Sequence, residues 1–222
     1  MKPPGIPWKV YLRNGVGQRF SRLGERAGIH WMTYNPLVMQ QFHDSALDNA
    51  PKVVNALQTV FPSAIRVLDV GAGSGAFAAE FLRRGRSVVA CEHSQHGQKL
   101  ARRQGVDCRP FDLSQTPPCA IEEKFDLVYC FEVAEHLTPD MGMKLVRFLS
   151  GFGAPIVFTA AQPGQGGTGH INEQPPSYWR ERFSSVSRIW DEQRSELLSR
   201  RFKAEKAAEW FYRNVLVFEA AS

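Results

Sequence analysis

The stretch that decides the fold is Val67-Leu-Asp-Val-Gly-Ala-Gly-Ser-Gly-Ala76, an apolar run that leads into a glycine-rich turn. The apolar residues from Ile65 to Val70 predict a buried strand, and residues 76–84 predict a helix that stops at Gly85. Glycines between a strand and a helix let backbone amides approach a ligand closely. We therefore expect a ligand-binding turn here, with a tight turn that binds nothing as the alternative.

The glycines of this turn also match a dinucleotide-binding fingerprint. Gly71, Gly73 and Ala76 satisfy G-x-G-x-x-G/A. Glu92 follows about 20 residues later, where a ribose-binding acid belongs. Asp69 helps to separate the possible ligands, because a carboxylate at this position would repel a pyrophosphate and suits a ligand with a cationic amino group. A nicotinamide-binding domain stays an alternative.

Outward from this stretch, short apolar runs alternate with helical patterns. We expect further strands over 87–92, 106–109, 125–131 and 155–159, and helices over 94–104 and 139–149. The end of the chain departs from this order, with a helix over 177–183, a strand over 186–190, a charged helix over 191–208 and a strand over 214–219. Residues 36–60 predict a helix that Pro51 breaks into two pieces. The alternation predicts an α/β fold with parallel βαβ units in a doubly wound sheet.

Composition and charge limit the function classes. The chain has 222 residues, of which 43% are hydrophobic, and this suits one domain with an extension. The six Lys or Arg and the single Glu of residues 1–26 account for the whole net charge of +5, so the rest of the chain is neutral. This distribution disfavours a whole-surface nucleic-acid binder and assigns the basic character to an N-terminal arm.

The cellular compartment is predicted from the transmembrane, signal-peptide and cysteine patterns of the sequence. No run of about 18 apolar residues exists, so we expect no transmembrane helix. The residues from Met1 to Trp8 lack an apolar signal core, which indicates a cytoplasmic protein. The cysteines form no CxxC pair; they are Cys91, Cys108, Cys119 and Cys130. We expect reduced, buried thiols rather than a zinc site or a disulfide framework.

The D-x-G-x-G-x-G pattern from Asp69 to Gly75 resembles motif I of the class I S-adenosylmethionine-dependent methyltransferases. The resemblance extends over residues 62–219. It implies a Rossmann-like, mostly parallel, seven-stranded sheet whose last strand is antiparallel, with an N-terminal helical extension. It also divides the chain into a basic, aromatic arm and helical lid over residues 1–61 and a catalytic domain over residues 62–222.

The resemblance implies where S-adenosylmethionine binds. Glu92 ends the second strand, where the family binds the ribose diol, and Asp112 follows the third strand, where the family contacts the adenine amino group. Phe131 and Glu132 end the fourth strand, where the methionine part of the cofactor lies. The full set is Asp69, Gly71, Ala72, Gly73, Glu92, His93, Asp112, Leu113, Phe131 and Glu132. Two local alternatives stay open: a turn cap for Asp112 and a solvent-facing strand end for Glu92.

Groups that can activate a hydroxyl acceptor come after the fourth strand. Methyl transfer is an in-line displacement that depends on positioning, but a hydroxyl usually needs a base or a metal to lose its proton. In Glu132-Val-Ala-Glu-His136, two acids and an imidazole stand at i, i+3 and i+4, so a helical turn would place them on one side. His170 lies in the glycine-rich loop after the fifth strand. The catalytic candidates are Glu135, His136 and His170.

The E-x-x-E-H segment with a later histidine resembles the metal-binding set of small-RNA 2′-O-methyltransferases, and a similar segment occurs in ubiquinone-pathway O-methyltransferases. The candidate metal ligands are Glu132, Glu135, His136 and His170. Two carboxylates and two imidazoles suit Mn²⁺, Fe²⁺ or Zn²⁺ better than Mg²⁺. Without a metal, Glu132 would face the cofactor, Glu135 and His136 would cap or pack the next helix, and His136 or His170 would act as a general base.

Two further segments bear on the acceptor. The loop and helix start over 163–179 offer His170, Asn172, Glu173 and Gln174 as hydrogen-bonding groups, with Tyr178 and Trp179 either walling the site or anchoring the helix. The N-terminal arm interleaves aromatic and basic residues, which favours a lid over the substrate pocket. The same mixture can bind single-stranded nucleic acid or anionic sugars.

The hypothesis that combines these features is an O-methyltransferase for a small molecule or a glycan. The stretch His170-Ile-Asn-Glu-Gln-Pro175 is similar to a loop of bacterial methyltransferases that act on such acceptors. An RNA 2′-O-methyltransferase is the alternative that the E-x-x-E-H segment and the arm favour, although the neutral body and the lack of a separate RNA-binding module count against it. A non-catalytic cofactor-binding partner subunit and a nicotinamide oxidoreductase are the other classes.

Overall fold

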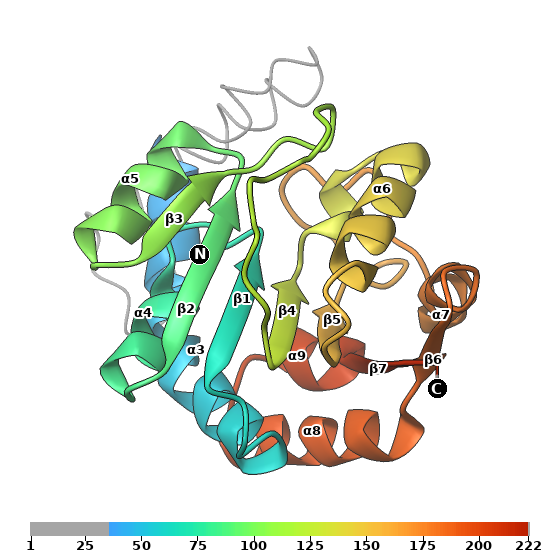
Figure 1. The fold of residues 1–222 in the computed structure, drawn as a ribbon. Coiled ribbons are helices and arrows are strands. Elements are labelled where there is room, and N and C mark those ends of the chain that lie inside the picture. The colour runs from blue at the N-terminus through green and yellow to red at the C-terminus, as the bar shows by residue number, and fades with distance from the viewer. Residues whose placement is uncertain (1–35, 222) are drawn as a thin grey trace, which may run out of the picture.

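The computed structural model describes residues 36–221, and the basic arm of residues 1–26 lies outside the described residues. A seven-stranded sheet runs through the middle of this part of the chain (Figure 1). Its strands are β1 (Arg66–Val70), β2 (Ser87–Glu92), β3 (Asp107–Pro110), β4 (Leu127–Phe131), β5 (Ile156–Thr159), β6 (Arg188–Trp190) and β7 (Leu216–Ala220).

The strand order is β3-β2-β1-β4-β5-β7-β6. The first five strands pair in parallel, and β7 is antiparallel to both β5 and β6. The predicted doubly wound sheet with an antiparallel last strand is thus confirmed. The chain order reverses between β1 and β4, and ligands of such sheets bind where the carboxyl ends of the strands meet this reversal.

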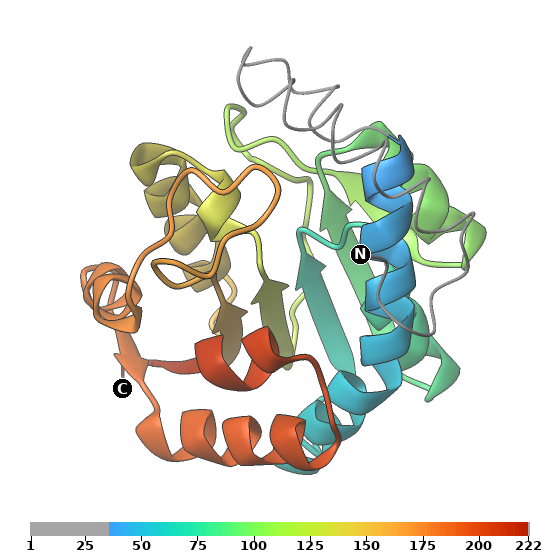
Figure 2. The ribbon, with the colours of Figure 1, turned by 180° about the vertical axis from the view of Figure 1, so that it is seen from behind.

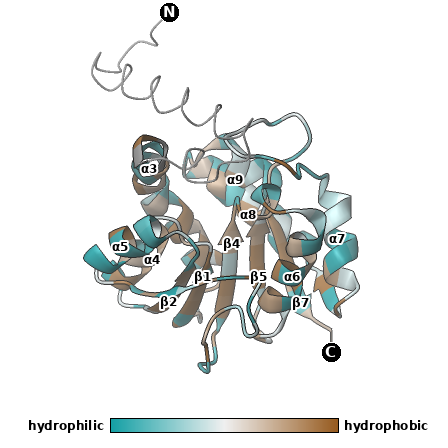
Figure 3. Cartoon of the chain, turned by 90° about the horizontal axis from the view of Figure 1, so that it is seen from above, coloured by the Kyte–Doolittle hydropathy of each residue, from teal (hydrophilic) through white to brown (hydrophobic). Residues whose placement is uncertain are grey.

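Helices cover both faces of the sheet (Figures 1 and 2). The helices are α3 (Pro36–Val60), α4 (Ala76–Arg83), α5 (Gln95–Arg103), the 3₁₀ turn η1 (Ala134–His136), α6 (Pro139–Ser150), α7 (Pro176–Ser184), α8 (Glu192–Ala204) and α9 (Glu209–Asn214). Residues of α3, α4, α5, α8 and α9 share one buried cluster with the sheet, and residues of α6 and α7 share the other. In Figure 3 the strands are predominantly hydrophobic, whereas the helices carry hydrophilic outer faces.

Two helical predictions were wrong. Pro51 does not break α3, which runs on from Pro36 to Val60 with the proline inside it. Pro51 is exposed and is followed by the fully buried Val53 and Val54, so tertiary packing outweighs one missing backbone hydrogen bond. The charged helix ends at Ala204 rather than at residue 208, because Lys206 adopts a left-handed backbone with φ 57°. The short helix α9 that follows was not predicted.

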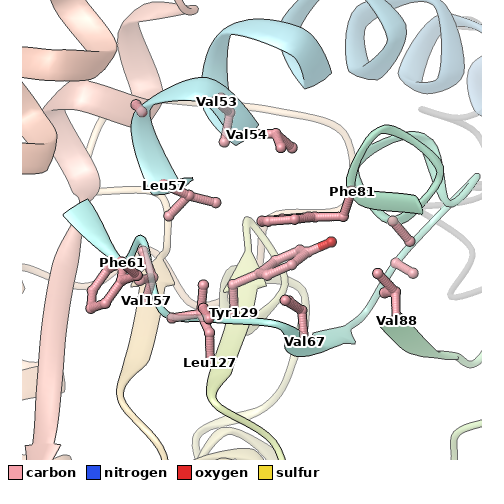
Figure 4. Packing of buried hydrophobic residues seen from close by; sticks show 14 of the residues in the cluster. Val53, Val54, Leu57, Phe61, Val67, Phe81, Val88, Leu127, Tyr129 and Val157 are labelled. Atoms are coloured by element: carbon pink, nitrogen blue, oxygen red, sulfur yellow. The ribbon is translucent and has the colours of Figure 1, made fainter. Parts of the chain in front are cut away.

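The second half of α3 belongs to the core of the sheet. Figure 4 shows Val53, Val54 and Leu57 lying over Phe81 and Tyr129. All three aliphatic side chains are fully buried, and each contributes roughly 1.5 to 3 kcal/mol by leaving water. This packing anchors α3 to the sheet. The division of the chain between residues 61 and 62 stays a prediction.

Within residues 36–221, no helix has the length and the apolar character needed to cross a membrane.

Candidate functional site

A cavity of about 370 Å³ lies at the carboxyl ends of β1 and β4. Its walls come from α3, the glycine-rich turn after β1, the end of β4, the loop over residues 165–170 and α9. In Figure 2, α3, α9 and this loop face one another in front of β1 and β4. The cavity therefore occupies the reversal point of the sheet, where the topology predicts a ligand site.

The glycine-rich turn is shaped by close contacts. The amides of Gly71 and Ala72 both donate to the Cys91 carbonyl, at 2.8 and 3.0 Å. Gly71 has φ 77°, and a Cβ added to it would lie 2.3 Å from Cγ2 of Val133. Gly73 has φ 55°, and a Cβ on it would meet no atom within 4 Å. Gly71 is thus required for packing, while Gly73 presents bare backbone to open space, as a ligand cradle requires.

Asp69 lies in the floor of this cavity at the end of β1. It is only 3% exposed, and its Oδ2 atom has no hydrogen-bond partner among the described residues. Burial raises the pKa of this carboxyl to about 7; the nearby Tyr129 hydroxyl opposes the rise, and the charge of Glu92 adds to it. A buried carboxylate oxygen without a partner fits a ligand that brings a cationic group to it.

Glu92 and Asp112 are held by local backbone amides. Glu92 is buried, so its interpretation as a solvent-facing strand end was wrong; its two oxygens accept from the amides of Gly73 at 2.8 Å and Ser94 at 2.6 Å. Burial raises the pKa of Glu92. Asp112 accepts from both the amide and the hydroxyl of Ser114, which confirms the turn cap and lowers the pKa of Asp112.

The described cavity walls include only part of the predicted cofactor set. Asp69, Gly71, Ala72, Gly73, Phe131 and Glu132 line the cavity, whereas Glu92, His93, Asp112 and Leu113 do not. Glu92 ends β2, His93 follows it, and Asp112 and Leu113 come after β3. Both strands lie on the β1 side of the reversal. His93 Nδ1 lies 2.9 Å from the Phe111 carbonyl, which ties the two strand ends together. Their role in cofactor binding stays a prediction.

Glu132 does not join the predicted helical turn with Glu135 and His136. It has φ 51°, a left-handed backbone that precedes the 3₁₀ turn of η1. Its carboxylate accepts from Nδ2 of Asn214 and from Nε2 of Gln165, both at 3.0 Å. The expected helical turn over these residues was therefore wrong, because Glu132 adopts a left-handed backbone. The Glu132 carboxyl nevertheless lies close enough to Glu135 to raise the pKa of Glu135.

Glu135, His136 and His170 do come together. One potential ligand atom from each lies within 4.8 Å of the others, and the two imidazole rings are 4.9 Å apart at 77°. Glu135 is fully buried, and neither of its carboxylate oxygens has a hydrogen-bond partner of good geometry among the described residues. Burial, with the charge of Glu132, raises its pKa well above the usual range. This donor set, a buried carboxylate with two imidazoles, fits a divalent transition metal.

Both imidazoles are oriented through their Nδ1 atoms. Nδ1 of His136 lies 3.2 Å from the Gly169 carbonyl, and Nδ1 of His170 lies 2.9 Å from Oε1 of Glu173. A carbonyl and a carboxylate only accept, so these contacts assign the proton of each neutral ring to Nδ1 and leave Nε2 as the basic atom. Nε2 of His170 is 4.0 Å from Oε1 of Glu135.

Several loop residues have structural roles. The Glu173 carboxylate accepts from the amides of Gly164 and Gly166 as well as from His170. Asn172 is buried and donates to the Ala134 carbonyl at 3.4 Å, and Gln174 donates to Asn172. These three side chains are thus engaged within the protein. Trp179 is 1% exposed and packs against Phe158, which confirms the anchoring role.

Sequence reasoning missed two parts of the site. Gln165 and Asn214, which hold Glu132, were not singled out. Asn214 ends α9, two residues before β7 begins, and this position close to the last strand is the signal that was available. The aromatic wall was missed as well. Phe131 makes edge contacts with Phe77 and Phe211, with ring centroids 5.6 and 5.4 Å apart.

The described lining contains two acids and two imidazoles but no Lys or Arg. Aromatic rings from four segments complete it: Phe42, Phe77, Phe131, Trp210 and Phe211. An anionic acceptor would find no fixed positive charge among these walls, whereas a neutral acceptor with an apolar face would pack well on them.

Comparisons with known proteins identify similar sequences. A family model described as a methyltransferase domain matches residues 68–149. A ubiquinone biosynthesis O-methyltransferase of Bradyrhizobium sp. (strain ORS 278) is 32% identical over 130 residues, which cover 56% of this chain and 48% of that protein. One of the same name from Rhodopseudomonas palustris (strain BisB18) is 29% identical over 148 residues, covering 58% of this chain and 53% of the relative. The chain thus spans about half the length of the curated relatives it matches.

Solved structures share the fold. An amino pentose methyltransferase from Micromonospora echinaspora, with S-adenosylmethionine bound, aligns with a TM-score of 0.60 at 17% identity, covering 83% of this chain and 97% of that one. A mitomycin 7-O-methyltransferase aligns with a TM-score of 0.66 at 14% identity, covering 96% of this chain and 68% of that one. At these identities the likeness concerns the fold alone.

Proposed function

The chain carries a class I S-adenosylmethionine-dependent methyltransferase domain, and on this premise we propose that it methylates a hydroxyl oxygen of a small, uncharged acceptor. One observation carries the proposal. Asp69 at the end of β1, Gly73 of the glycine-rich turn and the imidazoles of His136 and His170 line the same cavity. A methyl donor and a group that can take a proton from an acceptor can therefore be held within one site.

The residues of this chain fit the cofactor. When bound, S-adenosylmethionine supplies an electrophilic methyl group on a sulfonium. Asp69, with its unpartnered Oδ2, would hold the cationic amino group, and the bare backbone at Gly73 would admit the cofactor. Phe131 would pack beside it at the end of β4. Glu92 and Asp112 would hold the nucleoside half from the ends of β2 and β3.

The proton of the acceptor would pass to an imidazole. Glu173 fixes the proton of His170 on Nδ1, so Nε2 is the basic atom, and His170 lines the cavity. The acceptor hydroxyl would donate to this nitrogen as its oxygen becomes a nucleophile. Gly167 lies against the ring, because a Cβ on it would come within 2.3 Å of His170 Nε2. The loop therefore controls access to the base.

A metal-assisted form of this reaction uses the same side chains. Glu135, His136 and His170 would hold the ion, which would supply a Lewis acid that lowers the pKa of the acceptor hydroxyl. The buried oxygens of Glu135, which have no hydrogen-bond partner of good geometry among the described residues, support this arrangement. Glu132 is left out of the ligand set, because Gln165 and Asn214 hold its carboxylate.

The cavity walls favour a neutral acceptor over an anionic one. No Lys or Arg belongs to the described lining, and aromatic rings form much of it. This favours a small hydroxylated molecule with an apolar or aromatic face over RNA, whose 2′-hydroxyl lies beside phosphates. The names of the curated relatives, ubiquinone biosynthesis O-methyltransferases, also denote O-methylation.

The test is a methyl-transfer assay with labelled S-adenosylmethionine on three probes: catechol, an amino sugar and a single-stranded RNA oligonucleotide. We expect label on catechol and no label on the RNA.

Gly167→Ala should abolish transfer without weakening cofactor binding, because the added methyl group displaces the His170 ring. Prolonged EDTA treatment followed by Mn²⁺, Zn²⁺ or Mg²⁺ tests the metal. Label on the RNA alone would overturn the acceptor class, and activity unchanged by EDTA would remove the metal.

A further inference from the structure

Two cysteines from different segments are in direct contact in the buried cluster between the sheet and α6 and α7. Sγ of Cys91, in β2, lies 2.9 Å from Sγ of Cys119, in the segment between β3 and β4. Both side chains are buried, with Cys119 4% exposed. Both are free thiols in this structure. Two sulfur atoms at this separation need to approach by only about 0.9 Å to reach the length of a disulfide bond.

The sheet selects this pair among the four cysteines of the chain. Successive side chains of a strand point to opposite faces, and Cys91 and Cys119 belong to the buried cluster that also contains α6 and α7. Cys108 stands opposite Ala90 in the β2–β3 register, and both belong to the cluster on the other face. Cys130 lies on β4, two strands away from β2. Cys119 is therefore the thiol that meets Cys91.

We propose that Cys91 and Cys119 form a redox modification site, at which hydrogen peroxide converts the two thiols into a disulfide that clamps the segment carrying Asp112. The Cys119 thiolate would attack one peroxide oxygen, forming a sulfenic acid and releasing hydroxide. The deprotonated sulfur of Cys91 would then attack Sγ of Cys119, form the S–S bond and release a second hydroxide. In sum, two thiols and one peroxide give one disulfide and two waters.

The surroundings of the two sulfurs favour this order of events. The hydrogen bond from Cys91 and the positive charge of Arg109 lower the pKa of Cys119, so it is the better thiolate. The contact with Cys119 and burial raise the pKa of Cys91. Ala120 and residues 114–117 around Cys119 are exposed, and peroxide is small and uncharged. Cys119 is thus the sulfur that meets the oxidant first, and Cys91 is the resolving thiol.

The bond would join two parts of the ligand edge. The Cys91 carbonyl accepts from the amides of Gly71 and Ala72 in the glycine-rich turn. On the other side, the carbonyl of Pro118, next to Cys119, accepts from the amide of Asp112 at 2.9 Å. The disulfide would therefore keep the Asp112 segment closed against β2. This consequence rests on the proposed function, because it takes Asp112 as a contact of the cofactor's nucleoside half.

Peptide mapping of the full chain tests the dithiol without any cofactor. After treatment with a small excess of hydrogen peroxide, acid quenching and alkylation, we expect a Cys91–Cys119 linked peptide and alkylated Cys108 and Cys130. The oxidised chain should melt roughly 5 to 10 °C higher, and dithiothreitol should reverse the gain. Cys119→Ser should lose both effects, and the matched variant Cys108→Ser should keep both. Recovery of Cys119 as a free thiol, as a sulfinic acid or linked to Cys108 in the unmodified sequence would overturn the assignment.

A second measurement separates the clamp from the proposed function. The dissociation rate of S-adenosylhomocysteine should fall at least threefold on oxidation of the unmodified chain and stay unchanged in Cys119→Ser. Equal rates for the oxidised and reduced chain would overturn the clamp. If neither form binds S-adenosylhomocysteine, the proposed function and the clamp on cofactor exchange both fail, while the peptide map still decides whether the disulfide forms.

Discussion

Nδ1 of His170 lies 2.9 Å from Oε1 of Glu173, three residues further along the chain. The same carboxylate accepts from the backbone amides of Gly164 at 2.9 Å and Gly166 at 2.7 Å. One side chain therefore holds both the conformation of the loop and the tautomer of the imidazole. The hydrogen bond from His170 is the largest cause that lowers the pKa of Glu173, so the carboxylate stays charged.

Replacing this carboxylate should slow catalysis without weakening cofactor binding. In Glu173→Gln, one of the two accepting oxygens becomes an amide nitrogen, so the three donors around it cannot all be satisfied. We expect kcat to fall roughly 10- to 100-fold, as for other side chains that orient a functional histidine. The dissociation constant for S-adenosylhomocysteine should change less than twofold. Glu181→Gln, an exposed change in α7, is the matched control. A kcat within twofold of the unmodified chain would show that Glu173 does not position His170.

Glu135→Gln should separate function from stability. Burial raises the pKa of Glu135 well above its usual range, so the folded protein loses stability as the pH rises above the pKa of an unfolded glutamate. An uncharged side chain of the same shape removes this cost. We expect a Tm equal to or above that of the unmodified chain at pH 8, together with loss of bound metal and of methyl transfer. The measurement is thermal unfolding beside a Zn²⁺ or Mn²⁺ titration. A lower Tm with full activity would make Glu135 a structural residue.

Much of the fold follows from local sequence patterns. The alternation of apolar strands with helices predicted the parallel part of the sheet, because strand burial and helix periodicity depend on neighbouring residues. Pro51 was misjudged because the packing of Val53 and Val54 on the sheet is a tertiary effect. The helix α9 was missed because six residues carry too little periodic signal, although its Phe211 lies in the cavity wall.

The site was predictable as a set of residues but less so as a geometry. His136 and His170 were named from the sequence, and the structure brings them together. Glu132 does not follow the predicted helical turn for two reasons. Its backbone is left-handed, which no local sequence pattern predicts, and its carboxylate is bound by Gln165 and Asn214, which are distant in sequence. Such pairings arise from the closure of the sheet rather than from spacing along the chain.

The glycine at position 71 should resist substitution for two physical reasons. Gly71→Ala adds a Cβ at 2.3 Å from Cγ2 of Val133 and forces alanine into φ 77°. Strain of the backbone alone costs about 1 to 2 kcal/mol, and the overlap adds to it. We expect a loss of about 2 to 4 kcal/mol in urea denaturation. In Gly73→Ala the added Cβ meets no atom within 4 Å, so this change should cost only the free energy of the backbone strain. The double variant Gly71→Ala/Val133→Ala should lose less free energy of unfolding than the two single variants lose in sum, because the smaller side chain at position 133 relieves the overlap. If the losses of the two single variants simply add up in the double variant, the contact with Val133 is not the cause.

The raised pKa of Asp69 predicts how stability depends on pH. Burial raises this pKa from 3.8 to about 7, so the folded chain holds a proton that the unfolded chain releases. The proton on Asp69 stabilises the folded chain in full below pH 3.8, and this stabilisation is lost as the pH rises through 7. Its total is on the order of 4 kcal/mol. Without cofactor, the unmodified chain should therefore lose stability between pH 4 and 7 relative to Asp69→Asn. Urea denaturation across this range measures the difference.

An exposed change, Glu122→Gln, should leave the pH profile of unfolding as it is in the unmodified chain. If the difference in free energy of unfolding between Asp69→Asn and the unmodified chain does not vary with pH, Asp69 is not the group that holds the proton in the folded chain. The same titration should affect ligand binding: affinity for a ligand with a cationic amino group should weaken as the pH falls below 7, because a protonated Asp69 cannot pair with it.

The most direct test of the account is calorimetric titration of the unmodified chain and of Asp69→Ala with S-adenosylhomocysteine and, separately, with NAD. Asp69 is the buried carboxylate at the floor of the cavity, and its Oδ2 atom has no hydrogen-bond partner of good geometry among the described residues. It is therefore the residue whose removal should matter most for the cofactor. The account predicts that the unmodified chain binds S-adenosylhomocysteine and not NAD, and that Asp69→Ala weakens this binding at least 100-fold. Binding of NAD without binding of S-adenosylhomocysteine, or near-normal affinity in Asp69→Ala, would contradict it.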